Sequence, residues 1–404
     1  MSKLSKELSL IDIYLLSIGY IIGAGIFVII GKVGKYSKSL TWMPFIIAGL
    51  FALIIATTYV DISTLYETNH GDFKFIRQTI GEIPAIITII VLIGIGVFTN
   101  STVAISIGEF LSPLLSISPI AIGSFLIIVY SIINCNGIKQ TTQYNHICTI
   151  AEILALIVVC VYGYFIYSPS KKPSVNYDIS IPDMAYASIL ALFVYSGFEG
   201  TVKLSEEAKN TNDIPIAIVA SVISAIVLYV LVSITVLKCC SSEKLEKYPI
   251  PVVKIADMLF GKQISYLFYI IAIISITNTL LISILGTSRL FYSISREYSA
   301  LNIFTQVDKE RKTPVLATVA IAILSILFLF LNDVEILASI TSYLLFVIFI
   351  ILNYCLIHAY QDEKVREKLK GGWTHPINQG KPILPVIGLS ISIIMLVFSI
   401  FHKH

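Results

Sequence analysis

The chain consists of long apolar stretches separated by short polar segments. Each stretch is close to the roughly 20 residues that an α-helix needs to cross about 30 Å of hydrocarbon. A transmembrane β-barrel would instead show short segments of alternating hydrophobicity. The pattern predicts an all-α membrane protein with eleven transmembrane helices, at residues 10–31, 42–65, 83–111, 119–135, 143–167, 184–204, 215–237, 264–294, 313–332, 334–360 and 382–402.

Composition supports a membrane protein and excludes several other classes. Hydrophobic residues make up 56% of the chain and charged residues 13%, with a mean hydropathy of +0.87, which is more apolar surface than a soluble domain can bury. The formal net charge of +3 is too small to indicate nucleic acid as a partner. The six cysteines lie mostly inside apolar stretches and lack metal-ligand spacing, so neither a metal nor another cofactor is expected.

The charged residues that flank the predicted spans indicate an orientation. With the N-terminus in the cytoplasm, every arginine falls on the cytoplasmic side, together with the loops at 66–82, 295–312 and 361–381. Lysines occur on both sides, with more of them inside. The positive-inside rule therefore favours a cytoplasmic N-terminus, in a protein we expect in the plasma or cell membrane.

Two of the predicted helices contain glycine-rich interruptions. The first is broken at Gly23-Ala24-Gly25, and the sixth at "YSGFEG", where Gly197 and Gly200 flank Phe198 and Glu199. Because the two breaks are five spans apart along the chain, we predict two inverted repeats, residues 1–167 and 184–360, followed by a loop and final helix at 361–404. Paired breaks of this kind mark the binding site of secondary transporters. Alternatively, each glycine pair only lets a neighbouring helix approach closely.

The breaks expose backbone groups of opposite polarity. The first leaves four N–H groups without helical partners, those of Gly23, Ala24, Gly25 and Ile26, at the positive end of the following half-helix. The sixth frees carbonyl oxygens around Val194, Tyr195 and Ser196. Unpaired donors at this depth are tolerable where they face a cavity, and they suit a carboxylate. The carbonyl groups suit an ammonium group, so an α-amino acid is the simplest ligand that satisfies both.

Four ordered motifs resemble the amino acid–polyamine–organocation transporters. They are "GYIIGAGIF", "GDFKFIRQTIGEIP", "LFVYSGFEGTVKLSEEAKNTNDIPIAI" and "SRLFYSISREYSALNIF" followed by "KTP", and the resemblance covers about residues 8–360. It implies a five-plus-five inverted-repeat fold and transport of amino acids by alternating access. By position it implies that the substrate carboxylate binds at residues 23–26, that the amine lies near Val194, Tyr195 and Gly197, and that Phe198 is a gating aromatic. Many members have twelve spans rather than eleven, which leaves the oligomeric packing open.

Several polar residues inside the spans are candidates for coupling or binding. Many members of this family carry a lysine in the fifth helix where Glu152 stands, so the sign of the charge is reversed here. Glu152 is a candidate proton carrier, or it attracts a cation or the basic end of a substrate. Alternatively, it pairs with a lysine or solvent near the helix end. Glu199 either faces the substrate or stabilises the second half-helix. Asn100 and Asn278 either contact the substrate or form hydrogen bonds between helices.

These patterns favour a secondary transporter of amino acids, by symport or exchange, and no enzyme. A polyamine or organocation carrier and a non-transporting amino acid sensor or subunit are the alternatives. An intramembrane enzyme would need paired catalytic residues, whereas the six histidines are scattered along the chain. The chain also lacks a G-x-x-x-x-G-K-[ST] motif for ATP. The expected partners are an amino acid, a coupling proton and the lipid bilayer.

Overall fold

The computed structural model describes residues 6–66, 71–169, 174–245, 247–248, 250–370 and 372–401, and these segments are mainly helical. The α-helices are α1 (Leu10–Ala24), α2 (Ile30–Ser37), α3 (Trp42–Leu65), α4 (Gly71–Ile80), α5 (Glu82–Leu115), α6 (Pro119–Cys135), α7 (Ile138–Val161), α8 (Ile181–Tyr195), α9 (Phe198–Val202), α10 (Asp213–Cys239), α11 (Ser242–Leu245), α12 (Pro251–Phe260), α13 (Lys262–Ser295), α14 (Val315–Phe328), α15 (Val334–Ala359), α16 (Glu363–Leu369), α17 (His375–Asn378) and α18 (Ile383–Phe401). Tighter or wider turns form η1 (Gly25–Ile29), η2 (Lys38–Leu40), η3 (Tyr162–Ile166), η4 (Ser299–Thr305) and η5 (Leu329–Leu331).

The predicted spans coincide with apolar helices. Among the described residues, nine helical segments are long and apolar enough to cross a membrane. Two shorter apolar helices, Pro119–Cys135 and Val315–Leu331, occupy the fourth and ninth predicted positions. The segments between spans also contain short helices that the pattern did not predict, including α4, α11 and α12. Their polar or mixed sequences lack the sustained apolar run on which the prediction depended.

Side-chain caps explain where several helices begin. The Ser9 backbone N–H donates to the Asp12 carboxylate at 2.8 Å, and the Asp12 N–H returns a hydrogen bond to the Ser9 Oγ, which forms a capping box for α1. The Ser118 Oγ accepts the Ala121 N–H at the start of α6, and the Ser180 Oγ accepts the Asp183 N–H at the start of α8, each with proline in the first turn. These local signals fix the start of helices whose length is then set by packing.

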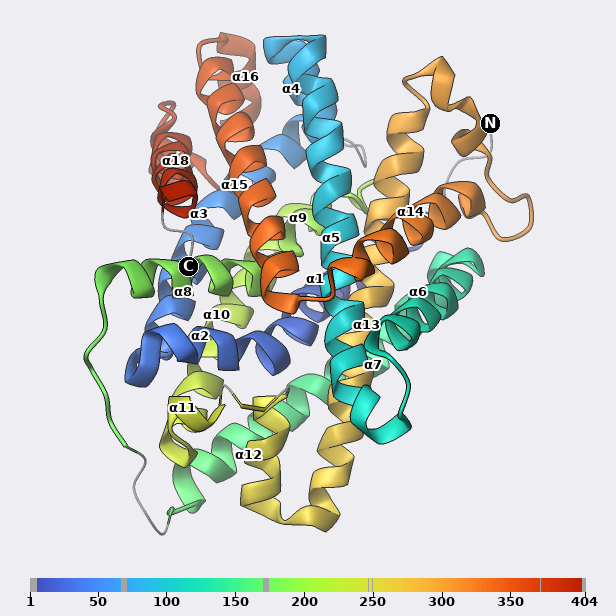
Figure 1. Cartoon of the computed structure of the whole chain (residues 1–404). Coiled ribbons are helices and arrows are strands. Elements are labelled where there is room, and N and C mark those ends of the chain that lie inside the picture. Colours follow the sequence, from blue (N-terminus) through green and yellow to red (C-terminus); the bar gives the residue numbers. More distant parts are fainter. Residues whose placement is uncertain are drawn as a thin grey trace.

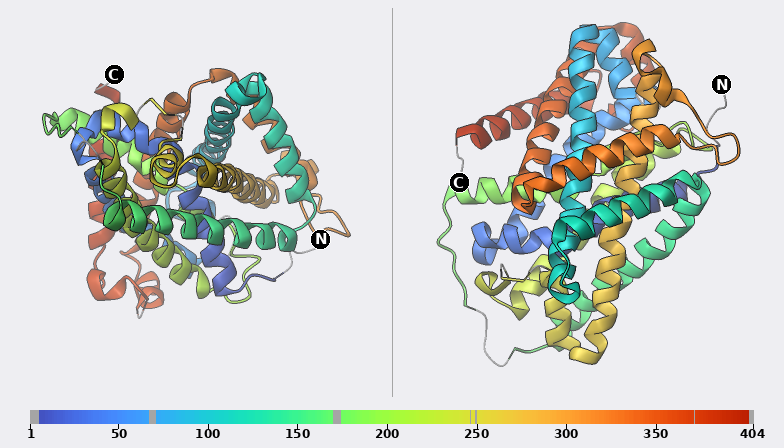
Figure 2. Two further views of the ribbon diagram at one scale, coloured as in Figure 1. Left: turned by 90° about the horizontal axis from the view of Figure 1, so that it is seen from below. Right: turned by 45° about the vertical axis from the view of Figure 1, so that its right-hand side comes forward.

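The two 34-residue helices α5 and α13 cross the molecule side by side and form its central axis (Figure 1). α4 and α16 lie at one end of the molecule, and α11 and α12 lie at the opposite end (Figure 1). α1 packs between α10, α13 and α7, so the first broken helix is in the interior. The last helix, α18, packs on α15 and α3 at the edge of the fold (Figure 2).

The N-terminal segment helps to close the end that carries α4. Leu8 forms a parallel bridge with Ala208, and the Lys209 N–H donates to the Leu8 carbonyl at 2.8 Å. Next to this bridge, the buried guanidinium of Arg289 lies 3.5 Å from the buried carboxylate of Glu207. The segment that follows the sixth predicted span is therefore held against both the N-terminus and α13.

Candidate functional site

The first helix is interrupted where the glycines predicted a break. Gly23 has a φ of −21° and a ψ of −110°, values outside the helical region, and the π-helix η1 follows at Gly25–Ile29. Such single π-helical turns are frequent at functional sites. Gly25 and Ile26 of this turn are buried. The Gly25 N–H donates to the Ile22 carbonyl oxygen, so the prediction that this N–H group lacks a helical partner is wrong, because the kink at Gly23 lets the chain close a tighter turn here.

Glycine is required in the first break because two other helices approach it closely. A Cβ atom on Gly23 would lie 1.6 Å from the Thr279 Oγ1 and 2.9 Å from the Ser275 carbonyl oxygen of α13. A Cβ atom on Gly25 would lie 2.5 Å from the Val194 Cγ1 and 3.0 Å from its Cα atom. The first break is therefore in direct contact with the last turn of α8, where the second break begins.

The second break is built from a left-handed glycine and an acidic side chain. α8 ends at Tyr195, and Gly197 has a φ of +132°, which L-residues with a side chain rarely adopt. The Gly197 N–H donates to the Glu199 Oε2 at 2.8 Å. Glu199 thus turns back onto the break that precedes it, which agrees with the structural role considered for this residue.

A tyrosine that the sequence analysis did not select connects the two breaks. The Tyr229 hydroxyl of α10 lies 2.6 Å from the Ile21 carbonyl oxygen and 3.1 Å from the Val194 carbonyl oxygen. Its one proton is shared between acceptors from both broken helices, so the Val194 carbonyl already has a protein partner. The Tyr195 hydroxyl instead donates to the Phe45 carbonyl of α3 at 2.7 Å. A single tyrosine inside the apolar run "VLYVL" was the available signal for Tyr229.

The candidate gate lies in an aromatic cluster beside the second break. The Phe198 ring centroid is 5.8 Å from that of Tyr59 on α3 and 6.3 Å from that of Phe349 on α15. Phe198 is fully buried by these contacts. Its ring therefore packs against α3 and α15 in the closed arrangement.

Glu152 is buried near the first break without a partner. Its side chain is 0% exposed, and neither carboxylate oxygen has a hydrogen-bond partner. Ser275, whose carbonyl oxygen borders Gly23, lies beside this carboxylate, and its hydroxyl also lacks a hydrogen bond. Within the described part of the chain, Glu152 forms no ion pair with a lysine, and it is closed to solvent.

The two candidate asparagines occupy different places. The Asn278 Nδ2 donates to the Asn145 Oδ1 of α7 at 2.8 Å, and both side chains border Gly19 on α1, one turn before the break. The Asn100 Nδ2 donates to the Ser325 Oγ of α14 at 3.0 Å. The structure thus brings Asn278 close to the broken helix, whereas the hydrogen bond of Asn100 connects α5 to α14.

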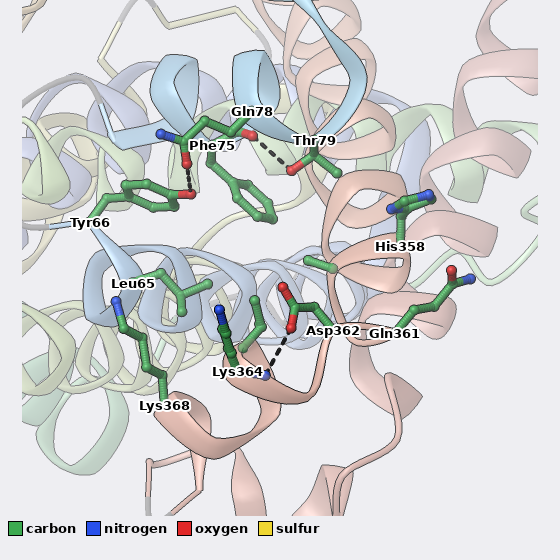
Figure 3. Close-up of a pocket in the computed structure, with 12 residues that line it drawn as sticks. Leu65, Tyr66, Phe75, Gln78, Thr79, His358, Gln361, Asp362, Lys364 and Lys368 are labelled. Carbon is green, nitrogen blue, oxygen red and sulfur yellow. Dashed lines mark hydrogen bonds between the residues drawn. The ribbon is translucent and has the colours of Figure 1, made fainter.

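The cavities show that the breaks are closed. The cavity next to them has a volume of about 10 Å³, enough for about one water molecule, and it is lined by Tyr20, Gly197, Gly200 and Gly286 among others. A cavity of about 630 Å³ lies instead at the α4 end, between Tyr66 and Gln78 on one side and Lys364 and Lys368 on the other (Figure 3). Among the described residues, the cavity next to the breaks is too small to hold an amino acid.

Known proteins similar to this chain are amino acid permeases and transporters. Residues 8–404 match the family model described as "Amino acid permease". The cationic amino acid transporter 8, vacuolar, and cationic amino acid transporter 1 of Arabidopsis thaliana are each 24% identical, over 86% and 88% of this chain. The branched-chain amino acid permease BcaP of Bacillus subtilis (strain 168) is 25% identical over 78% of this chain and 72% of its own length. The chain spans 62% and 63% of the length of the two plant relatives. With its multiple apolar helices and this match over nearly its whole length, the chain is a multi-pass membrane protein that belongs to the amino acid permease family.

Proposed function

We propose that the protein is a secondary carrier that moves amino acids across a membrane by alternating access. The observation that carries this proposal is the direct contact between the two broken helices at Gly25 and Val194. It brings the amide-rich start of one half-helix next to the carbonyl-rich end of another. A ligand that has a carboxylate and an amine on one carbon matches this polarity.

In the proposed site, the substrate carboxylate binds the backbone N–H groups of residues 23–26 and the amine binds near Val194, Tyr195 and Gly197. Since the Val194 carbonyl accepts a hydrogen bond from Tyr229, the amine either shares this acceptor or displaces the tyrosine hydroxyl. Phe198 covers the substrate as a gate, and Asn100 and Asn278 are further candidate contacts. Closure around the substrate excludes water, and opening to one side at a time prevents a continuous pore.

The proposed transport cycle uses the framework expected from the sequence. The nine long spans and the two shorter apolar helices give eleven crossings, of which the first ten form two inverted repeats, residues 1–167 and 184–360. One helix bundle rocks against the other around the paired breaks. The N-terminus and the α4 end face the cytoplasm of a cell whose plasma or cell membrane holds the carrier.

The test of transport is counterflow in liposomes that contain the purified protein. A carrier accelerates uptake of labelled substrate when unlabelled substrate is inside, whereas a sensor or subunit binds substrate without flux. The panel includes cationic and branched-chain amino acids, because the relatives carry these names, and polyamines. We expect acceleration by at least one amino acid. Acceleration by polyamines alone would make the protein an organocation carrier, and binding without acceleration would make it a sensor.

Glu152 is the proposed carrier of a coupling proton, with Glu199 as a second candidate. A carboxylate without a hydrogen bond in the interior is unfavourable, and a proton removes its charge. Glu152→Gln is expected to abolish the dependence of uptake on a pH gradient and to leave exchange largely intact. The exposed Glu109 offers a matched control, because Glu109→Gln makes the same chemical change and is expected to keep the gradient dependence. Unchanged gradient dependence in Glu152→Gln would contradict the role of Glu152.

A further inference from the structure

Besides Glu152, a group of buried charged residues lies around α9 and α4, at the end of the molecule that carries α4. Asp72 of α4, Glu199 of α9 and Lys203, which follows α9, are 3%, 1% and 3% exposed. The electrostatic interactions of Asp72 are with Lys203 and Glu199, and Asp72 in turn acts on the Tyr59 hydroxyl of α3. These four side chains form a buried cluster, which we call the Asp72 cluster.

The charges of the Asp72 cluster do not balance. Among the described residues, two carboxylates and one ammonium group leave one negative charge in the interior. Lys203 forms no ion pair within 4.0 Å in the segments that the structure covers, so it neutralises neither carboxylate by direct contact. Because burial disfavours an uncompensated charge, one further positive charge is needed when the end is closed.

The hydrogen bonds of the Asp72 cluster indicate which of the two carboxyl groups binds an additional proton. Glu199 accepts the Gly197 N–H at 2.8 Å, and a hydrogen bond from a backbone donor stabilises the ionised form. The Asp72 Oδ1, in contrast, is buried without any hydrogen-bond partner, as is the Tyr59 hydroxyl. A buried carboxylate oxygen that no donor stabilises is the less favourable place for the remaining negative charge, so Asp72 is the carboxyl group that a proton neutralises more readily.

We propose that Asp72 is a proton-binding site. In the closed structure its carboxyl group holds one proton, which makes the Asp72 cluster neutral. When this end opens and water enters, the O–H bond breaks, the proton passes to water, and Asp72 becomes a carboxylate beside the Lys203 ammonium group.

The electrostatics of the groups around Asp72 agree with this assignment. Burial raises the pKa of Asp72 to about 7, although the Lys203 ammonium opposes the shift, and the Glu199 carboxylate adds to it. Helices α5 and α15 also pack against α4, and their described residues contribute no titratable group to the shift.

The raised pKa gives the direction of the pH effect. A closed state with a pKa of about 7 binds the proton more tightly than a hydrated aspartate with a pKa of about 4. Protonation therefore favours closure, and raising the pH from 6 to 8 is expected to shift the ratio of open to closed protein by about tenfold towards opening. Above this range both states are deprotonated and the dependence levels off.

The experiment is an infrared pH titration of the purified full-length protein, without substrate, that follows the C=O stretch of protonated carboxyl groups. Asp61 of α3 is another buried carboxyl group, so every protein in this titration carries Asp61→Asn. In this background we expect a component with a midpoint near pH 7 that remains in Glu152→Gln and is lost in Asp72→Asn. In Lys203→Gln, where the opposing ammonium is absent, the midpoint is expected to move to higher pH. Thermal unfolding reports whether each variant is folded.

Each outcome decides the assignment. Persistence of the component in Asp72→Asn, or its loss in Glu199→Gln with Asp72 intact, would overturn the proposal. If Asp72→Asn does not fold, the Lys203→Gln midpoint decides, and an unchanged or lower midpoint would also overturn it. Because the titration uses no substrate, its result is independent of counterflow, so this proposal and the proposed carrier function can fail separately.

Discussion

The two helix breaks are stabilised in different ways. The first is held by its neighbours, since α13 and α8 approach Gly23 and Gly25 so closely that no side chain fits. The second is held mainly from within, by the positive φ of Gly197 and by the Glu199 carboxylate that accepts the Gly197 N–H. The first break depends on close packing, and the second depends on its own backbone and side chains.

The two breaks are expected to respond differently when the helix bundle opens. A break fixed by its neighbours changes when those helices move, so its N–H groups become available as the bundle opens. A break that caps itself keeps its shape through such a movement. We therefore expect the first break to respond to the transport cycle and the second to act as a fixed binding surface.

The largest effect on stability is expected from Gly197→Ala. The new residue would need a φ near +132°, and its Cβ atom would lie 3.0 Å from the Cγ atom of Tyr20. Backbone strain and crowding together are expected to lower the free energy of unfolding by about 2–5 kcal/mol. Thermal unfolding in detergent measures this, with Gly34→Ala as the control because a Cβ there has a nearest neighbour at 3.4 Å. Equal stability of the two variants would show that the second break is not fixed by its backbone.

A smaller loss is expected when the hydroxyl that joins the breaks is removed. Tyr229→Phe leaves the Ile21 and Val194 carbonyl oxygens without this donor, which is expected to cost about 1–3 kcal/mol of stability. Tyr354 on α15 is 52% exposed, so Tyr354→Phe serves as the matched control with little change. If both variants unfold at the wild-type temperature, Tyr229 does not couple the breaks.

The smallest effect on stability is expected from Glu199→Gln, which distinguishes the hydrogen bond of this side chain from its charge. Glu199→Gln keeps an oxygen that accepts the Gly197 N–H, so we expect a loss of about 1 kcal/mol, whereas Glu199→Ala removes the acceptor and is expected to cost more. Comparison of the two unfolding temperatures measures the difference. A glutamine variant as unstable as the alanine variant would mean that the charge, rather than the hydrogen bond, holds the second break.

Much of this organisation could be predicted from the sequence, for reasons that particular residues illustrate. The apolar stretches and the glycines at 23, 25 and 197 are local signals, and the helices and both breaks occur where these signals predicted them. The number of crossings and the repeats remain predictions, as do the roles of the candidate site residues.

The contacts between distant segments could not be predicted in the same way. The roles inferred for three residues, Tyr229, Asp72 and Lys203, depend on neighbours that are distant in the sequence and close in the fold. A single tyrosine, aspartate or lysine in the sequence does not indicate those neighbours. Asn100 shows the reverse case, since its type and depth suggested a binding role while its hydrogen bond connects to α14.

Counterflow by Gly25→Ala, compared with Gly34→Ala, tests the central claim that the paired breaks bind the substrate. A Cβ at Gly25 would meet the Val194 Cα at 3.0 Å and separate the two breaks, whereas a Cβ at Gly34 makes ordinary contacts. We predict that the wild type and Gly34→Ala accelerate uptake of a labelled amino acid, and that Gly25→Ala, although folded, does not. Normal counterflow by Gly25→Ala would contradict the account.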